Sequence, residues 1–141
     1  MTRFLSIYSD LPDEDKETLR VIDRSCFIGE PHVFHRQDLI VMVADEEGSI
    51  MGFLSVTTKG FVERTGVLPK FRGRGLQREM IRCAMKRFNK LRTYTRRDTD
   101  GRISAWNFVE CGFKYVRKSD EFFYLSWKRA RRRRKKIKGT V

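Results

Sequence analysis

A glycine-rich turn carries the strongest chemical signal in this sequence. Two glycines alternate with arginines in Arg72-Gly73-Arg74-Gly75, and an amphipathic helical pattern begins directly afterwards at Leu76. Glycine lets the backbone approach a ligand closely and adopt positive φ. The first N–H groups of a helix have no partners within it and lie at the positive end of the helix dipole, where they can bind phosphate. The turn matches neither G-x-G-x-x-G nor the nucleotide P-loop. It still predicts an anionic ligand, with a plain strand-to-helix turn as the alternative.

Positive charge is concentrated in the second half of the chain. Residues 1–63 carry 6 basic and 12 acidic side chains, whereas residues 64–141 carry 25 basic and 6 acidic ones. Nine of the basic side chains lie in Lys128–Lys138. A run of like charge stays extended until it meets a polyanion, so we expect nucleic acid, the ribosome or another acidic partner to bind it. A solvated tail that only aids solubility is the alternative.

The cysteines and histidines predict neither a disulfide framework nor a metal site. Cys26, Cys83 and Cys111 are odd in number, widely spaced and outside any C-x-x-C pair. His32 and His35 are expected to be ordinary loop residues. No apolar run reaches the roughly 20 residues of a membrane helix, and the N-terminal segment lacks the pattern of a secretory signal. We therefore expect a cytoplasmic protein that does not bind a membrane.

Hydrophobic periodicity and turn residues predict a mixed α/β domain that positions the turn. The patterns indicate strands at residues 3–8, 39–44, 50–57, 61–67, 92–95, 113–116 and 122–127. Helices are expected to begin at Pro12, at Leu76, from which an apolar stripe continues to Leu91, and at Arg102. Residues 29–38 indicate a loop or a short helix. The predicted domain covers residues 1–127, followed by a basic tail at residues 128–141.

Residues 67–77 resemble the acyl-CoA-binding motif of the GNAT N-acetyltransferases, V-x-P-x-x-R-G-x-G-x-G/A. Arg72 and Gly75 fall on core positions of that motif, whereas Gln77 replaces its usual Gly or Ala. The resemblance implies the α/β GNAT fold. That fold has a mixed central sheet of about six to seven strands, splayed between the fourth and fifth strands and flanked by about four helices.

The same resemblance implies acetyl-CoA as the acyl donor. In the family, the pantetheine arm of acetyl-CoA lies between the splayed strands and pairs with the fourth one. The amides of the glycine-rich turn bind its pyrophosphate. The residues implied here are Val67 and Leu68 beside the pantetheine and thioester, and Arg72, Gly73, Arg74, Gly75, Leu76 and Gln77 at the pyrophosphate.

Glu63 is the first implied catalytic residue. It lies on the fourth predicted strand, where the family often has a glutamate that takes the proton of the attacking amine. Because strand side chains alternate, we expect its side chain to share a face with Phe61, Thr65 and Val67. A surface carboxylate paired with a neighbouring basic residue is the alternative.

Ser104 is the second implied catalytic residue, as the acid for the leaving thiolate. It belongs to a second block that resembles the family and ends at Gly112-Phe113. The usual acid is a tyrosine four residues before that glycine, but this position holds Phe108, which has no proton to donate. A hydroxyl that only satisfies backbone groups at a helix start is the alternative for Ser104.

These residues favour an acetyl-CoA-dependent N-acetyltransferase that acts on a primary amine of a protein or a small molecule. The alternative is a catalytically degenerate GNAT-fold protein, similar to small phage virion components, that uses its basic tail to bind nucleic acid. Phe108 and Gln77 favour that alternative, and the intact glycine-rich turn favours the enzyme.

Overall fold

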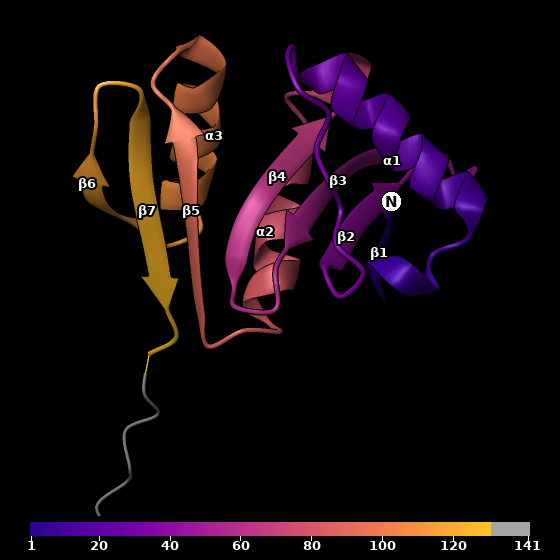
Figure 1. Ribbon diagram of the computed structural model, residues 1–141, viewed down its shortest axis with the longest axis horizontal. Helices are drawn as coiled ribbons and strands as arrows, with labels where there is room; N and C mark the ends of the chain where they lie inside the picture. The colour runs from indigo at the N-terminus through magenta and orange to yellow at the C-terminus, as the bar shows by residue number, and fades with distance from the viewer. Residues whose placement is uncertain (131–141) are drawn as a thin grey trace, which may run out of the picture.

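A computed structural model describes residues 1–130, which form a seven-stranded sheet with helices on both faces (Figure 1). The predicted tail beyond residue 130 lies outside the described residues. The strands are β1 (Thr2–Ile7), β2 (Leu39–Ala44), β3 (Ile50–Val56), β4 (Phe61–Val67), β5 (Lys90–Arg96), β6 (Lys114–Lys118) and β7 (Phe122–Lys128). The helices are α1 (Asp13–Cys26), α2 (Leu76–Met85) and α3 (Thr99–Glu110), with short 3-10 turns at Tyr8–Asp10 and Pro69–Phe71.

The sheet is splayed at its centre. Its strand order is β1-β2-β3-β4-β5-β7-β6, and among the described strands only β4 and β5 run parallel. Phe61 lies opposite Arg92 and Val62 opposite Thr93, after which the pairing stops. β4 then continues along β3 alone and β5 along β7. Figure 1 shows the two strands diverging, as the GNAT resemblance implied.

Two hydrophobic clusters hold the helices on opposite faces of the sheet. α1 packs on β3 and β4 and buries Leu19 and Ile22 against Phe53. α2 and α3 cover the other face, where Met80 and Phe108 are fully buried in the larger cluster. Figure 1 shows α1 in front of the sheet and the other two helices behind it. Each face of β3 and β4 is therefore packed, which fixes the strand that carries Glu63.

The predicted order of strands and helices is confirmed, including the three helices read from the sequence pattern, although the GNAT resemblance implied about four. The described residues hold three α-helices rather than about four. Residues 27–38 form no helix, because Gly29 has a φ of +119° and Pro31 has no N–H to donate. Within residues 1–130, no helix has the length and apolar character needed to cross a membrane.

The second helix ends earlier than its apolar stripe predicts. α2 stops at Met85, and Leu91 is buried in β5 instead. Arg129 holds this end of the helix, because its side chain donates hydrogen bonds to the carbonyl oxygens of Met85 and Phe88 at 2.7 and 3.2 Å. This contact spans 41 to 44 residues of sequence, so local periodicity cannot reveal it.

The third helix begins earlier than predicted. α3 starts at Thr99 rather than Arg102. Asp98 is its N-cap residue, and its carboxylate accepts a hydrogen bond of 2.8 Å from the Gly101 N–H. An Asp in this position satisfies one of the unpaired donors of the first helical turn. The helix start therefore lies directly beside the splayed end of β5.

Candidate active site

Two clefts adjoin in the gap between β4 and β5. The first has a volume of about 460 Å³ and the second about 440 Å³. Glu63 lines the first cleft, and the glycine-rich turn lines the second. The residues that line both are Cys26, Phe27, Thr65, Asp100 and Ser104. Because the clefts share this wall, a group bound in one lies next to a group bound in the other.

The glycine-rich turn presents open backbone to the second cleft. Gly73 and Gly75 have φ values of +80° and +75°, a region that favours glycine, and nothing lies within 4 Å of where a β-carbon would stand. Gly75 is the N-cap residue of α2, and its carbonyl accepts from the Glu79 N–H. Among the described residues, no hydrogen bond uses the N–H groups of residues 73–77. They are available to an anionic ligand.

Three arginines surround this turn, and hydrogen bonds hold two of them. Arg72 Nε donates to the Val67 carbonyl oxygen at 3.0 Å, and Arg78 Nε donates to Asn107 Oδ1 at 3.0 Å. The Arg74 guanidinium lies over the aromatic ring of the preceding 3-10 turn, 5.3 Å from its centroid. Guanidinium groups fixed beside free amides suit a phosphate ligand in geometry and in charge.

A polar network joins α2 to α3 beside the turn. Gln77 Nε2 donates to Ser104 Oγ at 3.1 Å, and Asn107 Nδ2 donates to Gln77 Oε1 at 2.6 Å. The side chain of Gln77, which stands where the GNAT motif has Gly or Ala, therefore reaches across to α3. Because Ser104 Oγ accepts from Gln77, the hydroxyl hydrogen of Ser104 remains available for donation.

A β-bulge in β4 sets the direction of the Glu63 side chain. Val56 of β3 lies opposite Val62, and the next residue of β3, Ser55, lies opposite Arg64. Glu63 is therefore the extra residue of the bulge and has no partner on β3. A bulge bends its strand and interrupts the alternation of side chains between the two faces.

This bulge overturns one expectation about Glu63. Its side chain faces the loop after α1, on the same side of the sheet as Arg64, which bonds to α1. Thr65 instead lies opposite Leu54, and Val67 packs against the cluster beneath α2 that contains Leu54. The prediction that Glu63 shares a face with Thr65 and Val67 is wrong, because strict alternation does not cross a bulge.

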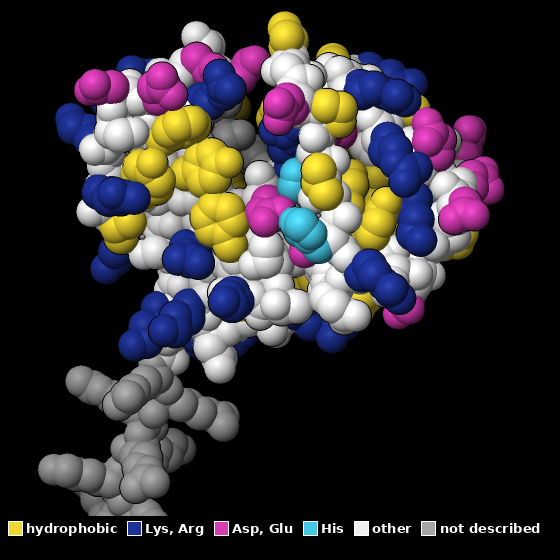
Figure 2. All heavy atoms as spheres, in the orientation of Figure 1, with side chains coloured by type: hydrophobic (Ala, Val, Ile, Leu, Met, Phe, Trp, Pro, Cys, Tyr) yellow, Lys and Arg dark blue, Asp and Glu magenta, His cyan; other side chains and the backbone are white. Residues whose placement is uncertain are grey.

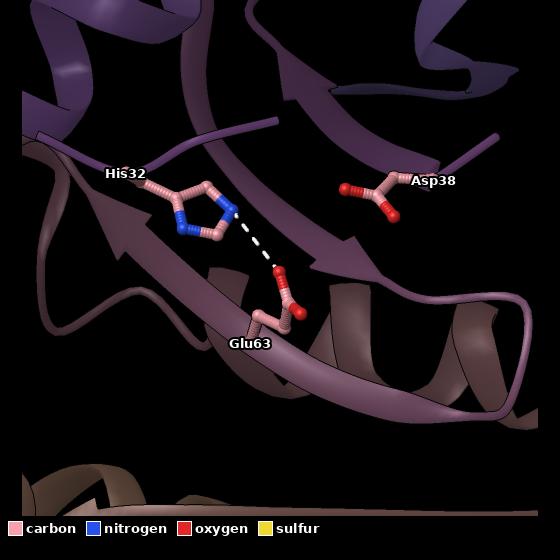
Figure 3. Close-up of side chains that lie close together, drawn as sticks. All are labelled: His32, Asp38 and Glu63. Carbon is pink, nitrogen blue, oxygen red and sulfur yellow. Dashed lines mark ion pairs between the residues drawn. The ribbon is translucent and has the colours of Figure 1, made fainter. Parts of the chain in front are cut away.

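Glu63 faces His32 and Asp38 (Figure 3). Glu63 Oε2 lies 3.7 Å from His32 Nε2, and the Glu63 side chain is 25% exposed. Burial, and after it the negative charge of Asp38, raise the pKa of Glu63. Burial, and after it the positive charge of Arg64, lower the pKa of His32. The site therefore pairs a carboxylate of increased basicity with an imidazole whose neutral form is favoured.

Asp23 fixes the loop that carries His32. The Asp23 side chain is only 4% exposed, and its Oδ1 accepts from Arg64 Nε at 2.8 Å. Its Oδ2 accepts from the His32 N–H at 2.9 Å. The Arg64 guanidinium also donates to the Glu30 carbonyl oxygen and lies 4.1 Å from the centroid of the Phe27 ring. One buried carboxylate thus ties α1, the loop and the bulged strand together.

His32, Asp38 and Glu63 also form the one group within residues 1–130 that could hold a metal ion. One ligand atom from each lies within 4.8 Å of the others. Asp38 Oδ2 already accepts from the His35 N–H at 2.8 Å and from the Ser55 hydroxyl at 3.5 Å. In this part of the chain, no hydrogen bond reaches His32 Nε2. The absence of a metal from this chain stays a prediction.

The second cleft gathers most of the residues implied to bind acetyl-CoA. Its lining includes Val67, Arg72, Gly73, Gly75, Leu76 and Gln77. Leu68 packs against the cluster beneath α1 instead, and Arg74 is not among the lining residues. Of the implied catalytic residues, Glu63 lines the first cleft and Ser104 lines both. Phe108 is 1% exposed and forms part of the wall of the first cleft.

Sequence reasoning missed the surroundings of Glu63. His32 was expected to be an ordinary loop residue, but its side chain faces Glu63. No motif or residue spacing in the sequence indicates that Asp38 lies near Glu63. One signal was present in α1, where Asp23 lies on the apolar stripe formed by Leu19 and Ile22. A carboxylate on a buried stripe needs a charged or hydrogen-bonding partner, so its position predicts a contact such as the one with Arg64.

Comparison with known proteins identifies the family. A sequence model of the acetyltransferase (GNAT) family matches residues 2–113. The chain therefore belongs to this family, and the GNAT resemblance drawn from the glycine-rich turn is confirmed. Membership also confirms the predicted class of enzyme, an acyltransferase, with acetyl-CoA as the acyl donor. A search of curated proteins finds no match.

Solved structures share the fold at low sequence identity. A putative phosphinothricin N-acetyltransferase is 15% identical, with a TM-score of 0.70 over 92% of this chain and 100% of its own. The spermidine N-acetyltransferase from Vibrio cholerae, solved with CoA and spermine, is 13% identical, with a TM-score of 0.66 over 90% and 95%. Arabidopsis thaliana Naa50, solved with a bisubstrate analogue, is 12% identical, with a TM-score of 0.69 over 91% and 99%. They support the fold.

Proposed function

We propose that this chain transfers the acetyl group of acetyl-CoA to a primary amine of a protein or a small molecule. The observation that carries the proposal is the shared wall of the two clefts. One cleft contains a carboxylate with a raised pKa, and the other contains an open glycine-rich turn. An amine in the first cleft and a thioester in the second would meet beside Thr65 and Ser104, which line both.

The second cleft is the proposed acetyl-CoA site. The free N–H groups of residues 73–77 would bind the pyrophosphate, with Arg72 and Arg78 beside them. Val67, on the splayed end of β4, would lie next to the pantetheine. Acetyl-CoA supplies an activated thioester. CoA is present in the solved Vibrio cholerae enzyme, and the bisubstrate analogue bound to the Arabidopsis protein contains it, which supports this assignment.

Glu63 and Ser104 are the proposed catalytic residues. Glu63 would accept the proton that the amine loses, directly or through a water molecule, and its raised pKa makes it a stronger base. Ser104 would donate its free hydroxyl hydrogen toward the departing sulfur. Phe108 cannot replace it, because a phenyl ring has no proton to transfer.

The first cleft is the proposed acceptor site. Its lining includes the carboxyl groups of Glu63, Asp98 and Asp100, which attract an ammonium ion. Tyr94 and Phe122 supply aromatic surface for the apolar part of the acceptor and for cation–π contact. The lining therefore suits a primary amine carried next to an apolar group, on either a peptide or a small molecule.

The basic run Lys128–Lys138 is the proposed contact with nucleic acid, the ribosome or another acidic partner in the cytoplasm. Nine positive charges in eleven positions support this assignment. The alternative, a GNAT-fold protein without turnover, gains no support from the comparisons, because the three structural relatives described above are all named as acetyltransferases or bind an acetyl-transfer analogue.

Steady-state acetyl transfer to a panel of amines, followed by release of the CoA thiol, tests the proposal. Glu63→Gln should lower kcat by about 10²- to 10⁴-fold, since it removes the general base. Ser104→Ala should lower kcat less, by about tenfold, because a thiolate is already a fair leaving group. Glu47→Gln, an exposed turn residue, is the matched control and should keep full activity. Full activity in Glu63→Gln, or no transfer to any amine, would contradict the proposal.

A further inference from the structure

One face of the outer half of the sheet is lined by aromatic and basic side chains. α3 packs on the opposite face of β5, β6 and β7. Residues directly opposite each other on paired strands point to the same face, so the register defines the residues of the open face. Its rows are Lys90 with Lys128, Arg92 with Ser126, Tyr94 with Tyr124, and Arg96 with Phe122.

The neighbouring strands extend this face and add to its positive charge. In β6, Lys114 lies opposite Ser126 and Arg117 lies opposite Tyr124. Phe61 of β4 lies opposite Arg92. β5, β6 and β7 contain no acidic residue. The basic side chains of the face are Lys90, Arg92, Arg96, Lys114, Arg117 and Lys128.

The aromatic rings of the face form a continuous cluster. Tyr94 lies at its centre, 5.6 Å from Phe61, 5.1 Å from Phe122 and 6.3 Å from Tyr124 between ring centroids. The residue Tyr94 is 42% exposed. Figure 2 shows hydrophobic side chains gathered over β5 and β7, with Lys and Arg side chains beside and below them. The cluster is exposed at Tyr94 and partly buried at the other three rings, so Tyr94 offers a flat surface for stacking.

Two arginines of this face make cation–π contacts with its aromatic rings. The Arg117 guanidinium lies 4.1 Å from the centroid of the Tyr124 ring, and that of Arg92 lies 5.4 Å from the centroid of Phe61. Among the described residues, neither forms a salt bridge. Both can therefore pair with phosphate, while the exposed ring of Tyr94, which neither guanidinium covers, can accept a base.

We propose that this open face of β5, β6 and β7 binds single-stranded nucleic acid. Six cations on three strands that hold no acidic residue complement a phosphate backbone, with Glu63 at the β4 edge of the face, and the exposed Tyr94 ring complements an unpaired base. A duplex hides the faces of its bases, so it can use the charges alone. The face does not include the proposed acetyl-CoA site, but Tyr94 and Phe122 also line the proposed acceptor cleft, so a bound strand would lie next to that cleft.

Fluorescence anisotropy with a labelled oligothymidylate of about 20 nucleotides, a length that covers one to several single-strand sites, tests the charge component. The full chain is used without acetyl-CoA. Arg92→Ala/Arg117→Ala should weaken binding at least tenfold. It should also reduce the slope of log K against log[salt] by about 1.4, since each phosphate that an arginine neutralises adds about 0.7. Arg82→Ala/Arg87→Ala removes the same charge from exposed positions in and after α2 and should change affinity less than twofold.

A tyrosine variant tests the stacking component. Tyr94→Leu should weaken binding of the single strand by about 5- to 100-fold and leave binding of a duplex of equal length unchanged. Tyr94→Phe keeps the ring and should retain affinity, which separates stacking from a folding defect. Equal weakening by the two arginine pairs, no effect of Tyr94→Leu, or tighter binding to duplex or to anionic phosphatidylserine vesicles would overturn the proposal.

Discussion

At the residue scale, the bulged Glu63 links pH to both activity and stability. Burial beside Asp38 raises its pKa, so its ionised form is disfavoured in the folded chain. Its contribution to stability is therefore present below the unfolded pKa of about 4.3 and is lost as pH rises through the higher folded value. Glu63 must be ionised to act as the proposed base, and its ionised form destabilises the folded chain.

The loss of stability on ionisation of Glu63 leads to a prediction for Glu63→Gln. The variant should gain stability relative to the parent chain as pH rises from about 4 to 7, and kcat/KM should lose the acidic limb of its pH profile. Thermal melts across that pH range check the gain in stability, and kcat/KM across the same range checks the loss of the acidic limb. A stability difference that shrinks as pH rises would show that the carboxylate is favoured in the fold and would contradict the account.

Asp23 is the second residue on which the site depends. Asp23→Ala leaves the half-buried Arg64 side chain and the His32 N–H without their partner, and we expect a loss of about 3–5 kcal/mol in the free energy of unfolding. Glu17→Ala on the same helix removes a carboxylate that is 58% exposed and paired with two arginines, and it should cost less than about 1 kcal/mol. Urea unfolding compares the two. Similar losses would mean that Asp23 does not hold the loop.

At the scale of elements, α3 is placed by the close approach of its first turn to β5. A β-carbon on Gly101 would overlap the carbonyl oxygen of Arg96. Gly101→Ala should therefore displace the helix start and cost about 3 kcal/mol or more. Gly48→Ala is the control, because its φ is +87° but nothing lies within 4 Å, and it should cost about 1 kcal/mol. Denaturant titration measures both, and equal costs would argue against the close contact.

The elements were predictable wherever the signal was local. The apolar run of β2, the Pro at the start of α1 and the glycine-rich turn before α2 each predict their element from neighbouring residues. The end of α2 was not predictable, because the residue that bonds to its last carbonyl groups is Arg129, which follows β7 more than 40 residues later in the chain. The bulge at Glu63 was not predictable either, because the residues of β4 give no sign of where the pairing with β3 gains an extra residue.

At the scale of the whole molecule, charge is arranged to favour anions. The net charge is +13, and the arginines around the glycine-rich turn add to the local field. Raising the ionic strength from about 0.1 M to 1 M shortens the Debye length from about 10 Å to about 3 Å. We expect the KM for acetyl-CoA to rise several-fold over this range while kcat stays constant. Initial rates across a salt series check this, and a constant KM would contradict it.

The assembly of the active site lies beyond what the sequence could predict. Most of the residues proposed to bind acetyl-CoA are contiguous in residues 67–77, so a motif was sufficient to propose that side of the site. The proposed acceptor side has Glu63 of β4 and Ser104 of α3 in its lining, with His32 and Asp38 of the loop before β2 beside Glu63, so its residues come from three separate segments. The splay of β4 from β5 and the ion pair between Asp23 and Arg64 help bring these segments together, although the paired residues are far apart in the sequence.

The most direct measurement of the central claim is calorimetric titration with acetyl-CoA. The parent chain should bind with a Kd of about 1 μM, or about −8 kcal/mol. Gly75→Glu places a negative side chain at the N-terminus of α2 and should abolish binding. Gly48→Glu makes the same change at another positive-φ glycine in open space and should bind as the parent does. No binding of the folded parent at millimolar acetyl-CoA, or equal binding by both variants, would contradict the claim that the glycine-rich turn holds the acyl donor.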